Sequence, residues 1–384
     1  MSNHGEEVEN IWCNIVTRFF VEHVFVNSRE RIVEALERFR ETLFRNKFFE
    51  RLDSMKLEEI YQPITADLGT MEDFLASSIR ESKSRSILAM SNFLLESSGK
   101  RIRPALVILS EKAASAGKDS TCDYDELIRI ATAVELIHMA SLIHDDVLDK
   151  AMMRRGKPSI NTRWGDDVSI AFGDYIYSKA FELIGKCRNP DVFTCISEAI
   201  YVMCEGELTQ VASRDNLDLS KDRYMVIVKK KTASLFAACC HVGTIIGNHN
   251  RAVQATLKEF GLNFGMAFQI IDDCRDIISD EKVLGKRPGQ DVLAGDITLP
   301  LLTLLDVIGQ ARSRELRNIL ESRVDQDSLR KMRTLFVNSD AADLTRKTAS
   351  SYIDMAKHKL DEIENSDYRK SLSYLADYIN QRTF

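Results

Sequence analysis

The sequence contains few of the residues that end helices and few of the alternating patterns that form β-strands. Its 384 residues include only 6 prolines and 17 glycines, the residue types that most often end helices and form turns. Alternating polar and apolar residues, which would indicate strands, are rare. From about Leu57 onward, apolar residues recur at spacings of three and four, as in Leu127, Ile130 and Val134. This pattern predicts an all-α protein, an antiparallel bundle with helices longer than average.

The chain also lacks a net positive charge, a cysteine framework and a secretory signal. Asp and Glu (58) outnumber Lys and Arg (52), for a net charge of −6, which argues against a nucleic-acid partner. The 8 cysteines show no CxxC pair or zinc-finger spacing, as expected of buried thiols in a reducing compartment. No apolar run approaches the ~20 residues that span a bilayer. We therefore expect a cytoplasmic protein without a transmembrane segment.

Residues 1–56 differ from the rest of the chain and are predicted to form an N-terminal helical extension to a main domain of residues 57–384. Residues 11–26 and 29–49 are amphipathic and rich in aromatic side chains. Apolar stripes of this kind usually pack on a core or on a second subunit, which is the interpretation that we favour. Peripheral contact with a membrane surface is an alternative, although the polar face is not strongly basic. Disorder is the third.

Two acidic clusters of the form DDxxD carry the strongest chemical signal, and each follows an apolar helical run. They are Asp145-Asp146-Val147-Leu148-Asp149 and Asp272-Asp273-Cys274-Arg275-Asp276. Positions i and i+4 share a helix face, so the first and last aspartates of each cluster point the same way. Stacked carboxylates repel one another unless a cation lies among them, and oxygen ligands suit Mg²⁺, which also binds substrate phosphate. One such cluster can be an exposed acidic turn; two predict a cup that binds a diphosphate through bridging metal ions.

Basic residues next to these clusters supply the complementary charge. They are Lys100, Arg101 and Arg103 in GKRIRP, Arg154 and Arg155 after the first cluster, and the lysines that precede Thr232 in KKKT. A run of charged residues usually lies on a solvent-exposed surface. Here the runs flank the acidic clusters in otherwise apolar sequence, and the first lies at a predicted helix start, where N–H groups favour anions. Phosphate binding is therefore the better interpretation.

These segments together resemble the trans-polyprenyl (isoprenyl) diphosphate synthase family, of the long-chain type. The matching segments in chain order are GKRIRP, LIHMASLIHDDVLDKAMMRRG, WGDDVSIAFGDYIYSKA, GELTQ, KKKTASLF, FGMAFQIIDDCRD and LGKRPGQDVLAGDITLPLL. The resemblance extends from about Leu57 to the C-terminus. It implies a bundle of antiparallel helices around a central cavity, usually homodimeric. It also implies a prenyltransferase that joins isopentenyl diphosphate to an allylic diphosphate by ionisation, condensation and elimination.

The resemblance assigns roles to single residues. Two or three Mg²⁺ ions would be held principally by Asp145, Asp149 and Asp272, with support from Asp146, Asp273 and Asp276. The allylic diphosphate would be bound by Arg154, Lys231 and Lys286, and isopentenyl diphosphate by Lys100, Arg103, His138 and Arg155. The dipoles of Thr232 and Gln269 would face the reacting carbons.

For His138, the resemblance to the family changes the interpretation that the sequence pattern alone would favour. At Asp296, the chain departs from the family. A histidine on an apolar helix, such as His138, is more often a satisfied core residue, but it lies seven residues before Asp145, near the same helix face. The family uses this position for diphosphate contact, whereas His144 has no such support. Many long-chain relatives carry a lysine where this chain has Asp296. Asp296 cannot donate positive charge and receives no role.

Product length is predicted from the helix that leads into the first acidic cluster. The position five residues before Asp145 is Ala140, with Ser141 beside it and Ile137 deeper. Short-chain relatives often close this position with an aromatic ring. A methyl group leaves the channel open, so the product is predicted to be longer than C20.

Three other interpretations are weighed against the synthase. A class I terpene cyclase shares the helical fold and one DDxxD, but it needs no isopentenyl site such as GKRIRP with His138. An HD-type phosphohydrolase is suggested by His144-Asp145, but its other histidine ligands have no counterparts. A noncatalytic subunit of a heteromeric synthase typically loses an acidic cluster, and both are intact here.

Overall fold

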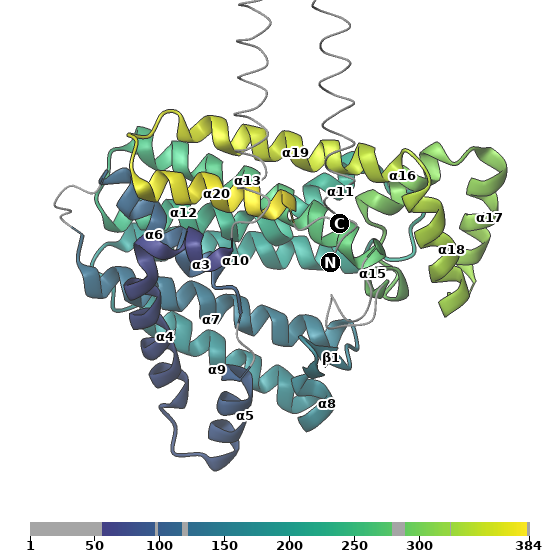
Figure 1. Ribbon diagram of the computed structural model, residues 1–384. Coiled ribbons are helices and arrows are strands. Elements are labelled where there is room, and N and C mark those ends of the chain that lie inside the picture. The colour runs from purple at the N-terminus through teal and green to yellow at the C-terminus, as the bar shows by residue number, and fades with distance from the viewer. Residues whose placement is uncertain (1–55, 97–98, 117–121, 279–288, 323, 382–384) are drawn as a thin grey trace, which may run out of the picture. The chain divides into compact units, whose positions relative to one another are not determined.

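The computed structural model describes residues 56–96, 99–116, 122–278, 289–322 and 324–381 (Figure 1). Helices make up most of this part of the chain, and the only strands within it form a two-stranded hairpin, so the predicted all-α fold is confirmed. The compact unit that contains it begins at Lys56. The proposed extension of residues 1–56 lies outside the described residues, apart from Lys56, and its role and boundary stay predictions.

One layer of the bundle is built around α7. Aspartate at its N-cap begins this helix: the Asp123 carboxylate accepts a hydrogen bond from the Glu126 N–H at 3.2 Å, which satisfies a free donor of the first turn. In Figure 1, α7 and α9 run side by side, and α7 also packs against α4 and α6. The helices of this layer are α4 (Thr65–Arg80), α5 (Arg85–Leu95), α7 (Tyr124–Leu148), α8 (Ile160–Trp164) and α9 (Asp166–Ile184).

Helix α7 corrects one prediction from the sequence. It is the single helix in the described part of the chain that is long and apolar enough to cross a membrane, although no such run was expected. The reason is that its charged residues are sparse rather than absent, as with Arg129 and Glu135. Because 72% of its most apolar window is buried inside the fold, α7 has the environment of a core helix.

A second layer packs around α12, a largely buried helix of the bundle. Phe236 on α12 and Phe264 on α13 make an edge-to-face pair with ring centroids 5.3 Å apart, a favoured aromatic geometry. A Cβ atom at Gly243 would lie 2.3 Å from the Val107 carbonyl oxygen of α6, so glycine is what lets these two helices approach. The helices are α6 (Ile102–Ala114), α10 (Pro190–Val211), α12 (Ser234–Ile246) and α13 (Arg251–Ile278).

The remaining helices flank these two layers. Helix α19 packs along α13, and α20 packs on α6 and α19 (Figure 1). The flanking elements are α3 (Leu57–Ile60), η1 (Gln62–Ile64), α11 (Lys221–Val228), η2 (Lys229–Ala233), α15 (Gln290–Leu293), α16 (Leu299–Val307), α17 (Gln310–Glu321), α18 (Gln326–Val337), α19 (Ala341–Leu360) and α20 (Asp367–Gln381).

A short antiparallel hairpin, the only sheet within the described ranges, follows the first acidic cluster. Its strands are β1 (Met153–Arg154) and β2 (Lys157–Pro158), with Arg154 paired to Lys157. The two turn residues, Arg155 and Gly156, have φ of +51° and +75°, as the tight turn of a two-residue hairpin requires. The hairpin thus holds two neighbouring arginines, one in a strand and one in the turn.

Candidate active site

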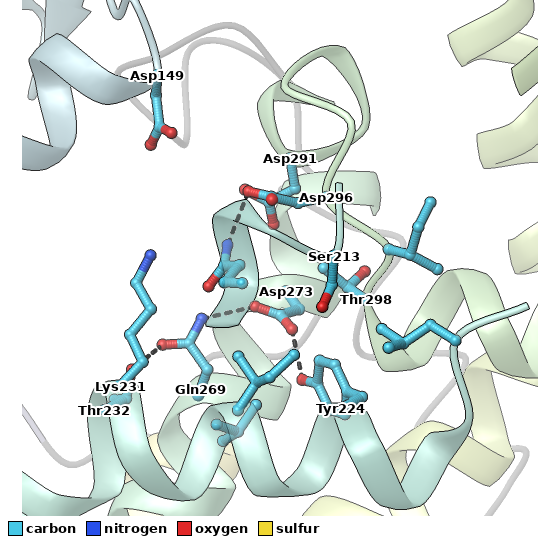
Figure 2. A pocket seen from close by; sticks show the side chains of 15 residues that line it. Asp149, Ser213, Tyr224, Lys231, Thr232, Gln269, Asp273, Asp291, Asp296 and Thr298 are labelled. Atoms are coloured by element: carbon cyan, nitrogen blue, oxygen red, sulfur yellow. Dashed lines mark hydrogen bonds between the residues drawn. The ribbon is translucent and has the colours of Figure 1, made fainter. Parts of the chain in front are cut away.

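The structure contains a cavity with an empty volume of about 650 Å³ that is partly open to solvent. Its walls come from the end of α7, from α10, α11, η2 and α13, and from the segment after α15. Asp149 from the first acidic cluster and Asp273 from the second both line it. Figure 2 shows Asp149 across the cavity from Asp273. One aspartate of each cluster therefore faces the same space.

Asp273 is the centre of a hydrogen-bonded network on one wall of this cavity (Figure 2). The Tyr224 hydroxyl donates to its Oδ2 at 2.5 Å, and Gln269 Nε2 donates to its Oδ1 at 2.6 Å. The Thr232 hydroxyl in turn donates to Gln269 Oε1 at 2.7 Å. Each oxygen of the buried carboxylate thus has a fixed partner, so Asp273, Gln269 and Thr232 are held in defined orientations.

A π-helical turn, η2, presents Lys231 and Thr232 to the cavity. Such turns are rare and occur frequently at functional sites. Helix α10 crosses η2 at Gly206, where a Cβ atom would lie 2.4 Å from the backbone nitrogen of Lys231 and 2.8 Å from the carbonyl carbon of Lys230. Only a glycine fits there, and its close approach sets where η2 lies.

Lys231 lies among carboxylates of this site. Its Nζ is 2.6 Å from Glu207 Oε2, and in Figure 2 its side chain extends toward Asp149. Burial would lower the pKa of Lys231, but the nearby Asp145, Glu207 and Asp149 outweigh burial and raise it. Lys231 therefore stays charged.

The first acidic cluster divides into residues with different environments. Burial raises the pKa of Asp145 to about 7, against the opposing effect of Lys231. Asp146 is 3% exposed and forms a two-pronged ion pair with Arg154, whose Nε lies 2.7 Å from both carboxylate oxygens. Asp149, at the C-cap of α7, points into the cavity. Of the three, only Asp149 lines the cavity, and Asp146 is engaged by the neighbouring Arg154.

The residues of the second cluster also lie in different environments. Asp272 was expected to be a principal ligand, with Asp273 and Asp276 in support. In the structure Asp273 lines the cavity, whereas the Asp272 side chain is 47% exposed and lies 3.9 Å from Arg275. The Oδ2 atom of buried Asp276 accepts a hydrogen bond from the Asp291 N–H at 3.0 Å.

A dense basic cluster surrounds His138 on α7. Burial lowers the pKa of His138 well below its usual value, and the charges of Arg103, Arg155, Arg154 and Arg101 lower it further. The histidine is therefore neutral and can act as a hydrogen-bond donor without adding charge. Two of these guanidinium groups already pair with carboxylates, Arg101 with Glu135 and Arg154 with Asp146. Arg103 and Arg155 are therefore the groups best suited to an anionic ligand.

Arg103 in this cluster has unmet bonding capacity. Its guanidinium carbon lies 4.4 Å from the centroid of the Phe236 ring. Its Nε is buried and finds no hydrogen-bond partner among the described residues. A buried donor without an acceptor costs about 1–3 kcal/mol, so an anion is the ligand that this nitrogen suits. Arg155 reaches the same segment, because a Cβ atom at Gly99 would lie 3.1 Å from its guanidinium.

The other predicted residues are placed as follows. The Lys100 Nζ lies 5.3 Å from the centroid of the Tyr378 ring. Ala140 and Ile137 are fully buried on α7, and Ser141 is partly exposed. None of these three lines the cavity of Figure 2. Lys286 lies outside the described residues.

The sequence did not point to several residues that the structure brings to this site. Tyr224, Gln210 and Asp291 line the cavity, and Arg214 connects Asp149 to Asp296. Gln210 lies in the segment GELTQ, which resembles the family, and Asp296 stands where many relatives carry a lysine. Neither feature predicts what the side chain contacts. Tyr224 and Arg214 stand in segments without any distinguishing pattern.

Comparisons with known proteins give the family. The model of the family described as polyprenyl synthetase matches residues 84–336. The chain belongs to this family. It is a transferase of prenyl groups, with the all-α fold of its relatives.

Individual relatives cover most of the chain. The short chain isoprenyl diphosphate synthase of Methanothermobacter thermautotrophicus is 34% identical over 81% of this chain and 95% of its own length. Component 2 of the heptaprenyl diphosphate synthase of Bacillus subtilis is 32% identical over 87% and 93%. The crystal structure of a polyprenyl synthase from Caulobacter crescentus, complexed with calcium and isoprenyl diphosphate, aligns with a TM-score of 0.81 at 32% identity, over 86% of this chain and 99% of that one.

The donor set of the cavity fits a divalent metal that is shared with a ligand. Within the described ranges, no group of three or more His, Cys, Asp or Glu side chains could hold a metal ion by itself. Carboxylate oxygens of Asp149 and Asp273 nevertheless face one cavity. Burial raises the pKa of both Asp145 and Asp273 to about 7, and added positive charge would return them to carboxylates. Hard oxygen donors of this kind suit a cation that keeps water and binds phosphate oxygens.

Proposed function

We propose that this prenyltransferase condenses isopentenyl diphosphate with an allylic diphosphate in a magnesium-dependent reaction. The observation that carries the proposal is the cavity lined by both Asp149 and Asp273, with Lys231, Thr232 and Gln269 between them. Magnesium ions, when bound, would neutralise the charge of the departing diphosphate. Asp145, Asp149 and Asp272 are the residues proposed to hold them, with support from Asp146, Asp273 and Asp276.

The protein's own groups contribute charge and orientation. Lys231 adds a fixed positive charge where the leaving diphosphate accumulates negative charge. The oxygens of Thr232 and Gln269, fixed by their hydrogen bond, present dipoles that stabilise an allylic carbocation. Apolar side chains such as Ile227 and Val228 line the same cavity and help to exclude water, which would otherwise capture the cation. The proton lost after condensation is proposed to pass to the departing diphosphate.

Isopentenyl diphosphate is proposed to bind in the basic cluster around His138. The buried Nε of Arg103 and the guanidinium of Arg155 would bind its phosphate oxygens, and neutral His138 would donate a hydrogen bond. Arg154, held by Asp146, lies at the boundary between this cluster and the acidic one. It is proposed to contact the allylic diphosphate.

The product is proposed to be longer than C20. The proposal rests on the small side chain of Ala140 on α7, at a position where short-chain relatives often carry an aromatic ring that would block a growing chain. The names of its relatives include both a short-chain and a heptaprenyl synthase, so family membership does not fix the length.

Replacing Ala140 with phenylalanine is expected to shorten the products while sparing the first condensation. The site is fully buried, so the ring would be forced into any channel that passes it. Overpacking costs about 1–3 kcal/mol, and the melting temperature of the variant should be measured with its products. Ser141→Phe, at a partly exposed position, is the matched variant. Products of unchanged length from both folded variants would show that α7 does not line the channel.

A homodimer is proposed, formed through α9 and α10. These helices carry an exposed apolar surface that includes Ile170, Phe181, Tyr201 and Leu208, the last two each 71% exposed. Phe193, Tyr201 and Leu208 follow one another at seven- and eight-residue intervals, so they lie on one side of α10. Exposed apolar residues gathered on one side of a helix are typical of interaction surfaces.

The proposal is tested on the purified chain alone. Fractions from gel filtration with light scattering are incubated with Mg²⁺, isopentenyl diphosphate and labelled farnesyl diphosphate, and the products are sized. We expect a dimer that extends the label and loses all activity with a chelator. Activity that requires a second, different polypeptide would contradict the homodimer. Release of diphosphate without extension of the label would contradict the prenyltransferase reaction proposed for the site.

A further inference from the structure

Arg214, in the segment that follows α10, links two distant parts of the active site. Its guanidinium uses three nitrogens. Nε donates to Asp296 Oδ1 at 3.1 Å, and one terminal nitrogen donates to Asp149 Oδ1 at 2.5 Å. The other terminal nitrogen lies 3.5 Å from the Leu148 carbonyl oxygen, at the C-terminus of α7, where a cation is favoured. The side chain is only 19% exposed.

Asp296 holds the Arg214 side chain in place. It is 5% exposed, and both of its oxygens are occupied: Oδ1 by Arg214 and Oδ2 by Gln210 Nε2 at 2.7 Å. Its backbone N–H donates to the Asp291 carbonyl at 2.8 Å. The carboxylate is thus fixed from the segment after α15, and it receives both side chains from the end of α10. The position of Arg214 follows from the position of Asp296.

Asp149 has no comparable support of its own. It stands at the C-cap of α7, with a side chain that is 37% exposed. Arg214 holds one carboxylate oxygen, Oδ1. Within the described residues, Oδ2 makes no hydrogen bond or ion pair. Without Arg214 the carboxylate would rotate freely at a helix end, whereas with it one oxygen is fixed and the other is presented to the cavity.

We propose that Arg214 is a positioning residue that orients Asp149 for metal binding, and that Asp296 acts through Arg214. The inference rests on the proposed function, because it concerns the same metal site. Arg214 is assigned no direct contact with the diphosphate, because protein acceptors face each of its three guanidinium nitrogens and set its position. Asp296 thereby gains a role, although it carries the wrong charge to bind the substrate.

Metal affinity is the readout that separates positioning from general damage. Mn²⁺ replaces Mg²⁺ as an ion with similar oxygen ligands, and its binding is followed by electron paramagnetic resonance with inorganic pyrophosphate present. We expect Arg214→Ala to weaken Mn²⁺ binding about 10- to 100-fold, the usual effect of losing a residue that orients a metal ligand. The KM for isopentenyl diphosphate should not change. Arg214→Lys, which keeps the charge but loses the planar fork, should lie between wild type and Arg214→Ala.

A double-mutant cycle tests the order of the contacts. If Asp296 acts only through Arg214, Arg214→Ala/Asp296→Ala will bind Mn²⁺ no more weakly than Arg214→Ala alone. Arg317→Ala is the matched control, since it removes an exposed arginine–aspartate pair with Asp218 that does not contact the cavity. This variant should bind Mn²⁺ like wild type.

The outcomes distinguish this inference from the proposed function. Wild-type Mn²⁺ affinity in both Arg214 variants would overturn the positioning role even if chain elongation is normal. Losses that multiply in the double variant would overturn the claim that Asp296 acts through Arg214. A wild-type protein that does not elongate prenyl chains would overturn the proposed function. The Mn²⁺ titration would still report whether Arg214 orients Asp149.

Discussion

Asp149→Asn is expected to lower kcat/KM for chain elongation by about 10³-fold and to leave the fold intact. Asparagine keeps the shape of the side chain and one oxygen that can accept from Arg214, but it removes the negative charge. A metal ion that stabilises transition-state charge is worth several kcal/mol, and about 4 kcal/mol corresponds to about 10³-fold in rate. The stability change should be small, because a partly exposed ion pair contributes about 0–1 kcal/mol.

The measurement is a Mg²⁺ titration of the elongation rate, with a thermal melt of the same sample. A lost metal ligand raises the Mg²⁺ concentration needed for half-maximal rate, whereas a residue that contacts only the prenyl chain would not change it. Asp327→Asn is the control, since Asp327 also pairs with an arginine but is 80% exposed on α18. Wild-type rate and metal dependence in Asp149→Asn would remove Asp149 from the metal site.

The sequence predicted the helices well because their signal is local. Helix α7 combines an apolar surface with an N-capping aspartate, and the only sheet in the described part of the chain is a two-residue-strand hairpin. Periodicity decides such elements whatever the rest of the chain does. The membrane-length apolar character of α7 was underestimated because Arg129 and Glu135 interrupt it without lowering its average by much.

The site was predictable to the level of motifs and not to the level of contacts. The DDxxD spacing identified six aspartates, but it could not tell that Asp146 pairs with Arg154 or that Asp273, more than Asp272, faces the cavity. Those differences depend on the rotation of each helix about its axis. A one-residue step along a helix turns a side chain by about 100°, and neighbouring helices set the final rotation.

Contacts between distant segments could not be predicted from the sequence. Tyr224 and Asp273 are separated by 49 residues, and Arg214 and Asp296 by 82. An isolated arginine in a loop has no pattern that marks its partner. The exchange of a common lysine for Asp296 was visible in the sequence. Only the structure explains this exchange, because it shows that Asp296 holds Arg214.

The π-helical turn η2 illustrates how packing can override local preference. The sequence of Lys229–Thr232 is typical of an ordinary basic α-helix. Nothing in it predicts the wider turn of a π-helix. The cause lies on another helix: α10 crosses at Gly206, within contact distance of the Lys230 and Lys231 backbone. The position of Lys231 in the cavity is therefore set jointly by its own segment and by a glycine 25 residues earlier.

Gly206→Ala is consequently expected to lower kcat/KM by about 10²-fold. Helix propensity favours alanine over glycine by about 1 kcal/mol, but the added methyl would lie 2.4 Å from the Lys231 nitrogen. The contact is with backbone, so α10 or η2 must move, and overpacking of this kind costs about 1–3 kcal/mol. Displacing a catalytic group by about 1 Å can cost about 10²-fold in rate.

The control for this variant is Gly69→Ala, in the middle of α4, where an added Cβ meets nothing within 4 Å. There the propensity term acts alone, so the protein should gain about 0.5–1 kcal/mol of stability and keep its activity. Thermal melts and elongation rates of both variants decide between the two effects. If Gly206→Ala were as active as wild type and more stable, the close approach of α10 to η2 would not govern the placement of Lys231. The glycine would then matter only through its helix propensity, which is the reverse of what the geometry implies.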